Sequence, residues 1–567
     1  MTFDAARALE SLSLLYGASA GAVLERWEAL LERHRRRLAD RPIPPSVDHT
    51  DVFLIAYPDQ LREPGRLPLT VLRDFARSRA SSFTGLHLLP FFPSSSDDGF
   101  SVTDFRRVDP AYGDWDDVAS LAGDFRLMVD LVLNHASAHS AWFDAFRRRA
   151  APYASYFRVP ERHGDWSQVV RPRTTPLFTE VDTSDGPVQV WTTFGPDQVD
   201  LDYREPAVLL EVVDLLLEYV ARGAQVIRLD AAAYLWKQSG TPCLHLPQTH
   251  AIVRLLRQSV RALAPGVQLI TETNVPHADN VRYFGDGDEA DWVYAFPLPP
   301  LVLHTLTTGD ATAFTDWLHD LRSPPGDGAY FNFLASHDGL GLNGASGLLS
   351  EAEIETLVRL AEQCGTVSYR SQSSGTPRPY ELNANLLDLL GGVPPDAPLP
   401  PWGVPRMICA HAILLALAGI PAVYFHSLVG SRGDAEAARR TGRPRAINRQ
   451  KLEVAALEAG LDDARSARRR VLDGIERLIL ARRSLPALDP LAAQRALRLG
   501  PGIVAIERAS RDGAQRMVCV HEVAGRETVA RAAPGGAAGR DVLTGETASL
   551  DGLDLAPYQA RWIEVVP

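Results

Sequence analysis

Residues 224–232 read AQVIRLDAA, and residues 266–280 read GVQLITETNVPHADN. Both stretches start as apolar runs with the pattern of a buried strand, and they reach the carboxylates Asp230 and Glu272 where the runs end. Burying a carboxylate costs several kcal/mol unless the group is paired or protonated. Either Glu272 has left the core and is solvated, or both strands end at a functional site.

These two stretches belong to a repeating sequence pattern that extends from residue 51 to residue 427. Short apolar runs alternate there with longer stretches whose apolar residues follow helical spacing. The strand candidates are residues 51–58, 85–92, 125–135, 224–232, 267–273, 291–296, 330–338 and 421–427. Such alternation predicts parallel strands joined by crossover helices, and eight units predict an α/β protein with a closed (β/α)8 TIM barrel. The active site of such a barrel lies at the carboxyl ends of its strands.

The chain extends beyond this barrel at both ends. We expect a helical extension over residues 1–45, a catalytic barrel over 46–485, and a small antiparallel β-domain over 486–567, where strand-like runs alternate with Gly-rich turns. Two connections, residues 139–200 after the third strand and 339–405 after the seventh, are too long for simple crossovers. Long loops in compact domains are functional lids or small inserted domains, so we predict insertions at both places.

Composition narrows the possible classes of function. A chain of 567 residues with 46% hydrophobic and 23% charged residues is typical of a globular protein with more than one domain. Its net charge of −12 argues against general nucleic-acid binding, and we interpret the basic run at 33–37 as a solvated helix end. No apolar stretch reaches about 18 residues, so we expect no membrane span.

The cysteines and the N-terminus indicate a cytoplasmic protein. Cys243, Cys364, Cys409 and Cys519 are far apart and lack the CxxC spacing of metal sites, so we expect free thiols in a reducing compartment. The N-terminal segment lacks the basic start and apolar run of a signal peptide. No ligand cluster suggests a metal, and we expect no cofactor.

Charged residues at three predicted strand ends indicate a chemistry. Side chains alternate along a strand, so Arg228 and Asp230 face the same way, either as a structural ion pair or as part of a site. An adjacent arginine keeps a carboxylate ionised, which suits Asp230 to be a nucleophile. Glu272 ends the next strand, where apolar walls and a second carboxylate raise its pKa and make it a proton donor. His337 and Asp338 add a third acid, and carboxylates with separated pKa values serve glycosidic-bond cleavage.

Four ordered motifs carry a family resemblance. DLVLNH (130–135), VIRLDAA (226–232), ITET (270–273) and LASHD (334–338) resemble the motifs of the α-amylase family of glycoside hydrolases, family 13. The resemblance implies that Asp230 is the nucleophile, Glu272 the general acid/base and Asp338 the transition-state stabiliser. It also implies which residues hold the glucosyl ring and the nucleophile, namely His135, Arg228 and His337.

A narrower resemblance concerns the sucrose phosphorylase subgroup. The stretch at 87–118, the stretch GTPCLHLPQTH at 240–250, VYAFPLPPLVLHTL and RAINRQ are similar to that subgroup. The resemblance implies that Asp97 and Arg449 clamp the terminal glucose, with Phe100 beside Asp97 in the same substrate site, so that one glucosyl unit fits. Without the resemblance, we would interpret Arg449 as an arginine on a surface loop.

The sequence differs from the sucrose phosphorylase subgroup at positions expected to bind the acceptor, the second substrate. Where sucrose phosphorylases carry Asp-Leu-Tyr-Gln, this chain has Arg378, Pro379, Tyr380 and Glu381, and Asn274 replaces the usual histidine after the acid/base. These changes put sucrose in doubt. TETNVPHADN at 271–280, TPCLHLPQTH at 241–250 and the long N-terminal helix look most like the glucosylglycerate phosphorylases of the same subgroup. Glycerate is an anion, and Arg378 is the cation that we would place against its carboxylate.

A phosphorylase must also favour phosphate over water, and positive charge at the acceptor site is the physical means. Candidates are Arg171 and Arg173 together with Arg378. The substrate-binding set is completed by Asn274, Tyr380 and Glu381.

The expected function is therefore the phosphorolysis of an α-glucoside with retention of configuration. The first candidate substrate is 2-O-α-glucosyl-D-glycerate, which would give α-glucose 1-phosphate and D-glycerate. The partners are a small sugar substrate and inorganic phosphate. The open alternatives are a sucrose or sucrose 6'-phosphate phosphorylase, an α-glucosidase or transglucosidase on the same scaffold, and a sugar-binding protein without activity. The sequence does not distinguish a monomer from a homodimer.

Overall fold

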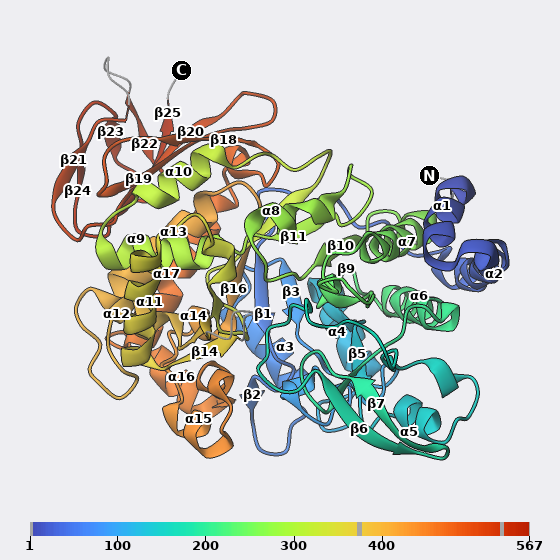
Figure 1. Ribbon diagram of the computed structural model, residues 1–567. Helices are drawn as coiled ribbons and strands as arrows, with labels where there is room; N and C mark the ends of the chain where they lie inside the picture. Colours follow the sequence, from blue (N-terminus) through green and yellow to red (C-terminus); the bar gives the residue numbers. More distant parts are fainter. Residues whose placement is uncertain (1–3, 371–376, 533–537, 566–567) are drawn as a thin grey trace.

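The computed structural model describes residues 4–370, 377–532 and 538–565 and contains a closed barrel of parallel strands (Figure 1). In chain order the barrel strands are β1 (Phe53–Ala56), β3 (Gly85–Leu88), β4 (Arg126–Val132), β9 (Val226–Asp230), β10 (Gln268–Thr271), β11 (Trp292–Tyr294), β12 (Ala329–Asn332) and β16 (Ile420–Tyr424). Each strand pairs with the next, and β16 pairs with β1 to close the ring. Each predicted strand segment supplies one of these strands, so the (β/α)8 fold is confirmed.

The barrel interior changes character along its axis. Phe53 on β1 reaches across to Trp292 and Phe331, with ring centroids 5.8 and 5.6 Å away. Gly85 on the adjacent strand leaves space for the Phe53 ring, because a Cβ there would lie 2.6 Å from it. Toward the carboxyl ends the interior side chains become charged, beginning with His87 and Asp130, which are both buried. An apolar plug therefore supports a polar rim, as expected for this architecture.

Helices surround the barrel and connect its strands. The main ones are α3 (Pro68–Arg79), α4 (Trp115–Asp124), α6 (Pro206–Ala221), α7 (Pro247–Leu263), α9 (Leu298–Thr308), α10 (Thr312–Asp320), α13 (Gly403–Ala416) and α17 (Ala467–Arg482). Their starts follow local rules. Proline opens α3, α6 and α7, and Asp114 with Asp117 forms a capping box on α4.

Both predicted insertions carry their own small elements. After β4, the strand β5 (His135–Ser137) pairs with β8 (Gln198–Asp200), and α5 (Ala141–Arg147) and the hairpin of β6 (Phe178–Thr183) and β7 (Gly186–Trp191) lie between them. After β12, a three-stranded sheet is formed by β13 (Leu340–Gly341), β15 (Arg378–Asn383) and β14 (Thr366–Arg370), with α11 (Glu351–Cys364) before β14 and α12 (Leu386–Gly391) after β15. Residues 371–376 of this second insertion lie outside the described residues.

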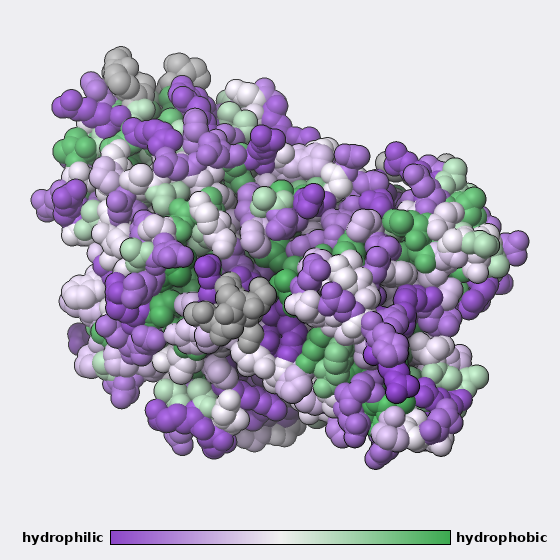
Figure 2. Space-filling model, in the orientation of Figure 1, coloured by the Kyte–Doolittle hydropathy of each residue, from purple (hydrophilic) through white to green (hydrophobic). Residues whose placement is uncertain are grey.

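The C-terminal segment folds into an antiparallel sheet beside the barrel, drawn in red in Figure 1. Its strands in spatial order are β18 (Ala493–Leu497), β19 (Ile503–Ala509), β20 (Arg516–Glu522), β25 (Ala560–Val565), β22 (Ala538–Asp541) and β23 (Thr547–Ser549). A two-stranded ribbon of β21 (Thr528–Ala530) and β24 (Leu553–Leu555) accompanies it. Figure 2 shows a predominantly hydrophilic surface, and among the described helices none combines the length and apolar character needed to cross a membrane.

The N-terminal extension forms two helices, α1 (Ala5–Tyr16) and α2 (Ala20–Leu38), that pack against α6 and α7 at the right of Figure 1. Trp27 is 1% exposed, and its Nε1–H donates to Ser259 Oγ on α7 at 3.0 Å. The basic run at 33–37 is solvated as expected except at His34, which is buried and lies 2.7 Å from Asp214 of α6. The helix pair therefore braces the two helices that flank strand β9.

We expect Trp27→Ala to lower the Tm, because removing a fully buried indole costs about 3–5 kcal/mol. Leu9→Ala, on the same helix pair but 39% exposed, should leave the Tm nearly unchanged. Thermal melting followed by circular dichroism measures both. Equal melting temperatures for the two variants would contradict the docking of this helix pair.

Candidate active site

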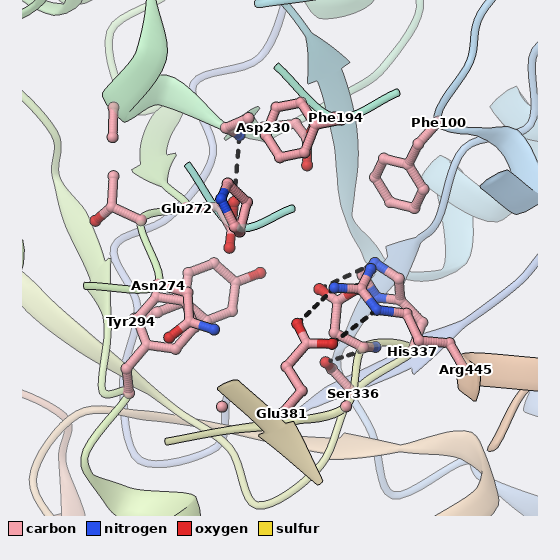
Figure 3. A pocket seen from close by; sticks show the side chains of 18 of the residues that line it. Phe100, Phe194, Asp230, Glu272, Asn274, Tyr294, Ser336, His337, Glu381 and Arg445 are labelled. Carbon is pink, nitrogen blue, oxygen red and sulfur yellow. Dashed lines mark hydrogen bonds and ion pairs between the residues drawn. The ribbon is translucent and has the colours of Figure 1, made fainter. Parts of the chain in front are cut away.

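The carboxyl ends of the barrel strands surround one pocket, shown in Figure 3. Most of the substrate and catalytic residues predicted from the sequence line it. They are Asp97, Phe100, His135, Arg173, Arg228, Asp230, Glu272, Asn274, His337, Asp338, Tyr380 and Glu381. Arg449 lies next to this lining and contacts Asp338, whereas Arg171 and Arg378 are not part of it.

The strand register determines how Arg228 is held. Arg228 on β9 pairs in register with Asp130 on β4, and its guanidinium contacts the Asp130 carboxylate directly. The same Nη1 lies 2.8 Å from Asp230 Oδ1. The Asp130 carboxylate also accepts a hydrogen bond from His87 Nε2 at 2.9 Å. Arg228 is 2% exposed, so a buried cation is shared between a supporting carboxylate and the candidate nucleophile.

The pKa of Asp230 departs from the sequence expectation. Burial raises it well above its usual range, and the charge of Arg228 does not cancel the rise. The physical reason is that Arg228 divides its charge between Asp230 and Asp130, a residue 98 positions away that sequence reasoning did not connect with it. Arg228 therefore does not hold the pKa of Asp230 low, so this contact by itself does not account for the ionised nucleophile that the sequence predicts.

The pKa of Glu272 is raised, as the sequence predicts. Burial raises it against the opposing charge of Arg228, and the Asp338 carboxylate adds to the rise. Its closest partner is the Ala231 N–H, which donates to Oε2 at 3.2 Å, while Arg228 Nη2 lies at 4.0 Å. Two adjacent buried carboxyls titrate as a pair. Because only Asp230 touches the guanidinium, we assign the negative charge to Asp230 and the proton to Glu272.

Backbone geometry contributes to this arrangement at Ala231. Its φ of 54° lies in the left-handed region, which is uncommon for an alanine and costs of order 1–3 kcal/mol. This conformation follows Asp230 directly and points the Ala231 N–H at Glu272. The sequence carries no signal for it, because the position is not a glycine.

Asp338 is held as an anion by several cations. Burial opposes its ionisation, but Arg445 and Arg449 bring the pKa of Asp338 well below its usual range. Arg445 contacts the Asp338 carboxylate directly and also binds Glu381 with two nitrogens, at 2.5 and 3.0 Å. Sequence reasoning missed Arg445, although it opens the RAINRQ stretch, because only the Asn-Arg pair of that stretch was singled out.

The predicted glucose clamp is an ion cluster around a buried arginine. Arg449 is 5% exposed, which excludes the alternative of a surface arginine, and its Nη1 lies 2.7 Å from Asp98 and 3.6 Å from Asp97. Burial opposes it, but the charge of Arg449 lowers the pKa of Asp98. Sequence reasoning named Asp97 and missed Asp98. Both aspartates have positive φ, at 51° and 49°, so the loop is bent to aim both carboxylates inward.

Aromatic and histidine side chains complete the sugar end. Phe100 stacks on the His337 ring at 4.9 Å between centroids, with an interplanar angle of 7°. Burial lowers the pKa of both His337 and His135, which keeps these imidazoles neutral. Gln198 from the first insertion lies between His135 and Asp97, at 3.1 and 3.3 Å, and was not predicted.

The three candidate acceptor arginines occupy different places. Arg173 lies in the pocket, 5.7 Å from the Phe194 ring centroid, and within the described chain it forms no ion pair. Arg171 points elsewhere, with Nη1 at 3.3 Å from the carbonyl oxygens of Pro176, Thr192 and Thr193. The Arg378 side chain is 59% exposed and lies 3.8 Å from Glu351. Of the three, only Arg173 is placed to meet a ligand in the pocket.

A (β/α)8 barrel with three carboxylates at its carboxyl rim defines a class of enzymes that act on glycosidic bonds. The family model described as the alpha amylase catalytic domain matches residues 80–338. The chain belongs to the α-amylase family of glycoside hydrolases.

Relatives within this family have closely similar sequences. The chain is 44% identical to a glucosylglycerate phosphorylase of Spirochaeta thermophila, over 91% of this chain and 89% of that protein. It is also 44% identical to a glucosylglycerate phosphorylase of Allomeiothermus silvanus, over 98% of each chain. Among solved structures, the sucrose 6F-phosphate phosphorylase of Thermoanaerobacter thermosaccharolyticum superimposes with a TM-score of 0.73 at 24% identity, covering 88% of this chain and 98% of that one, which supports the fold.

We expect Asp230→Asn to lose at least roughly 10³-fold in rate and to gain stability at neutral pH. The raised pKa means that the folded state ionises Asp230 at a cost that the unfolded chain, with an ordinary pKa of about 3.9, does not bear. The gain in Tm should therefore be present at pH 7 and shrink as the pH falls toward about 4. Activity assays and melting curves at both pH values measure this. Activity within tenfold of wild type would remove Asp230 as the nucleophile.

Proposed function

We propose that this protein is a retaining phosphorylase that converts 2-O-α-glucosyl-D-glycerate and inorganic phosphate into α-D-glucose 1-phosphate and D-glycerate. The observation that carries the proposal is one pocket holding three carboxylates, beside it a sugar clamp of Asp97 and the buried Arg449, and Arg173 without a carboxylate partner in the described chain. The choice of glucosylglycerate as the glucosyl donor is supported by two relatives at 44% identity, which are both named glucosylglycerate phosphorylases.

The first step forms a covalent intermediate. An Asp230 carboxylate oxygen attacks C1 of the glucosyl unit, the bond from C1 to the glycerate oxygen breaks, and Glu272 gives its proton to that departing oxygen. The product is a β-glucosyl ester of Asp230 and neutral hydroxyl on glycerate. The raised pKa of Glu272 suits it to hold this proton near neutral pH.

The second step reverses the roles. A phosphate oxygen attacks C1, the ester bond to Asp230 breaks, and Glu272 takes the proton of the attacking phosphate. Two inversions at C1 give α-glucose 1-phosphate, so the configuration is retained. In both steps positive charge develops on the sugar, and the ionised Asp338 is the group we assign to stabilise it.

Phosphate must compete with water for the intermediate. A guanidinium without a carboxylate partner attracts anions, and it binds phosphate or carboxylate with paired N–H groups. Arg173 therefore replaces Arg378 as the residue we propose to bind both anionic acceptors, phosphate in one direction and glycerate in the other. Asn274, whose Nδ2 donates to Tyr380 Oη at 3.4 Å, lies across the same pocket as a further acceptor-site group.

Product analysis tests the proposal. With glucosylglycerate as donor, glucose 1-phosphate should form when phosphate is present, and free glucose should form slowly in its absence. Sucrose and sucrose 6'-phosphate serve as competing donors in the same assay. Faster turnover of either one, or release of glucose independent of phosphate, would replace the proposed activity by one of the alternatives.

We also propose that the enzyme acts in the cytoplasm. The four cysteines, Cys243, Cys364, Cys409 and Cys519, are free and buried, and free thiols are typical of proteins in a reducing compartment. The proposed steps use side chains of this chain, the sugar and phosphate.

Glu272→Gln cannot donate a proton, so its effect should depend on the leaving group. With α-glucosyl fluoride, whose fluoride leaves without a proton, the burst that reports formation of the intermediate should survive. With glucosylglycerate the same variant should lose roughly 10²–10⁴-fold in rate. Rapid-quench kinetics with both donors measures this, and equal losses would make Glu272 a structural residue.

Arg173→Ala should impair both anionic acceptors. Loss of a charged hydrogen-bond partner costs about 2–4 kcal/mol, so we expect kcat/KM to fall roughly 30- to 1000-fold for phosphate and for glycerate. Glycerol, which lacks the carboxylate, should be affected much less in the synthetic direction. Arg378→Ala is the matched control and should leave all three acceptors nearly unchanged, because that side chain is exposed. The opposite pattern would return anion binding to Arg378.

A further inference from the structure

Glu381 and Arg445 form an ion pair at the edge of the active-site pocket (Figure 3). Glu381 lies on β15 and is 2% exposed, so its carboxylate is almost entirely withdrawn from bulk water. Arg445 comes from the short helix η7 (Pro444–Asn448) and reaches both Glu381 oxygens, at 2.5 and 3.0 Å. The two residues belong to segments far apart in the chain, a strand of the second insertion and a short helix after β16.

The same guanidinium also contacts Asp338, the carboxylate that faces the developing charge on the sugar. Arg445 therefore links Asp338, a reacting carboxylate, to Glu381, a carboxylate that takes no part in the proposed reaction steps. Without Glu381, the full positive charge of Arg445 would act on the sugar ring from beside Asp338. That charge would oppose the positive charge that glucosyl transfer develops at C1.

The other two arginines that touch reacting carboxylates follow the same rule. Arg228 contacts Asp230 and is balanced by Asp130. Arg449 lies 3.4 Å from Asp338 and is balanced by Asp98 at 2.7 Å. Each arginine thus contacts one reacting carboxylate and at least one other that balances its charge, and Arg449 has Asp97 at 3.6 Å as a second. A repeated arrangement from unrelated segments indicates a requirement of the site rather than an isolated contact.

We propose that Glu381 is a counter-ion that acts through Arg445: it cancels the guanidinium charge so that Asp338 can hold its position and still stabilise the cationic transition state. Glu381 is then a positioning residue for glucosyl transfer, and its effect is independent of which acceptor follows. The inference rests on the proposed function only for the transfer of a glucosyl unit through Asp230.

α-Glucosyl fluoride with saturating phosphate tests this directly. In the first step C1–F breaks, fluoride leaves as the anion, and the ester forms on Asp230, so fluoride release reports glucosyl transfer without glycerate. Glu381→Gln keeps the shape and removes the charge, and a single unbalanced charge at this range should lower kcat roughly 10- to 100-fold. The KM for phosphate should not rise, because the pocket becomes more positive.

The double variant Glu381→Gln/Arg445→Gln removes both charges together. We expect it to recover at least tenfold of the kcat lost by Glu381→Gln, a rescue that a purely structural or acceptor-binding glutamate would not allow. Glu351→Gln, whose side chain is 96% exposed and pairs with Arg378, is the matched control and should match wild type. Melting curves report the folding of every variant.

Three outcomes would overturn the counter-ion role. One is a double variant no faster than Glu381→Gln. Another is a Glu381→Gln variant with unchanged kcat and a raised KM for phosphate or glycerate, which would make Glu381 an acceptor ligand. If Glu381→Gln does not fold, a folded double variant that has lost more than roughly 10³-fold in kcat also overturns it. Failure of the glucosyl transfer on which the inference rests is distinguishable, because wild type would then release no fluoride at all, whereas a different donor or acceptor would leave fluoride release intact.

Discussion

The guanidinium of Arg228, enclosed by the barrel, is the group on which the rest of the site depends. A buried cation is costly unless carboxylates surround it, and here one carboxylate comes from the same strand and the other, Asp130, from the adjacent strand β4. Only the closed barrel in its observed register places Asp130 opposite Arg228. The apolar plug around Phe53, the helices α6 and α7, and the N-terminal helix pair braced on them all contribute to holding that register.

Charge balance explains why the pocket holds so many acids. Asp130, Asp98 and Glu381 each pair with an arginine, and Asp230 and Asp338 are the carboxyls that we assign as anions beside the proposed reacting centre. Glu272 touches no guanidinium nitrogen closer than 4.0 Å, and burial raises its pKa. Its different environment makes it the acid among these carboxyls. The raised pKa of Asp230 and the left-handed backbone at Ala231 show that this arrangement lowers the stability of the folded state.

The pocket is built from two kinds of structure. The groups that we propose to act on the sugar lie at or just beyond strand ends: Asp230 ends β9, Glu272 follows β10, and Asp338 lies between β12 and β13. The acceptor end is built from loops and inserted segments, which carry Arg173, Tyr380 and Arg445. Specificity in barrels varies through such loops while the strand ends are kept. This division explains how relatives named for glucosylglycerate and for sucrose 6F-phosphate share one fold.

The sequence by itself determined the strand order, the barrel and the carboxylates that we propose as catalytic groups. These features follow from local periodicity and from which residue ends each apolar run, so no distant contact is needed to see them. The tertiary structure decided which charges meet. Arg449 binds Asp98 351 positions away, Arg445 binds Glu381 64 positions away, and Arg173 rather than Arg378 reaches the pocket. Ion pairs and pKa values depend on distances between segments remote in the chain, and no local pattern encodes those distances.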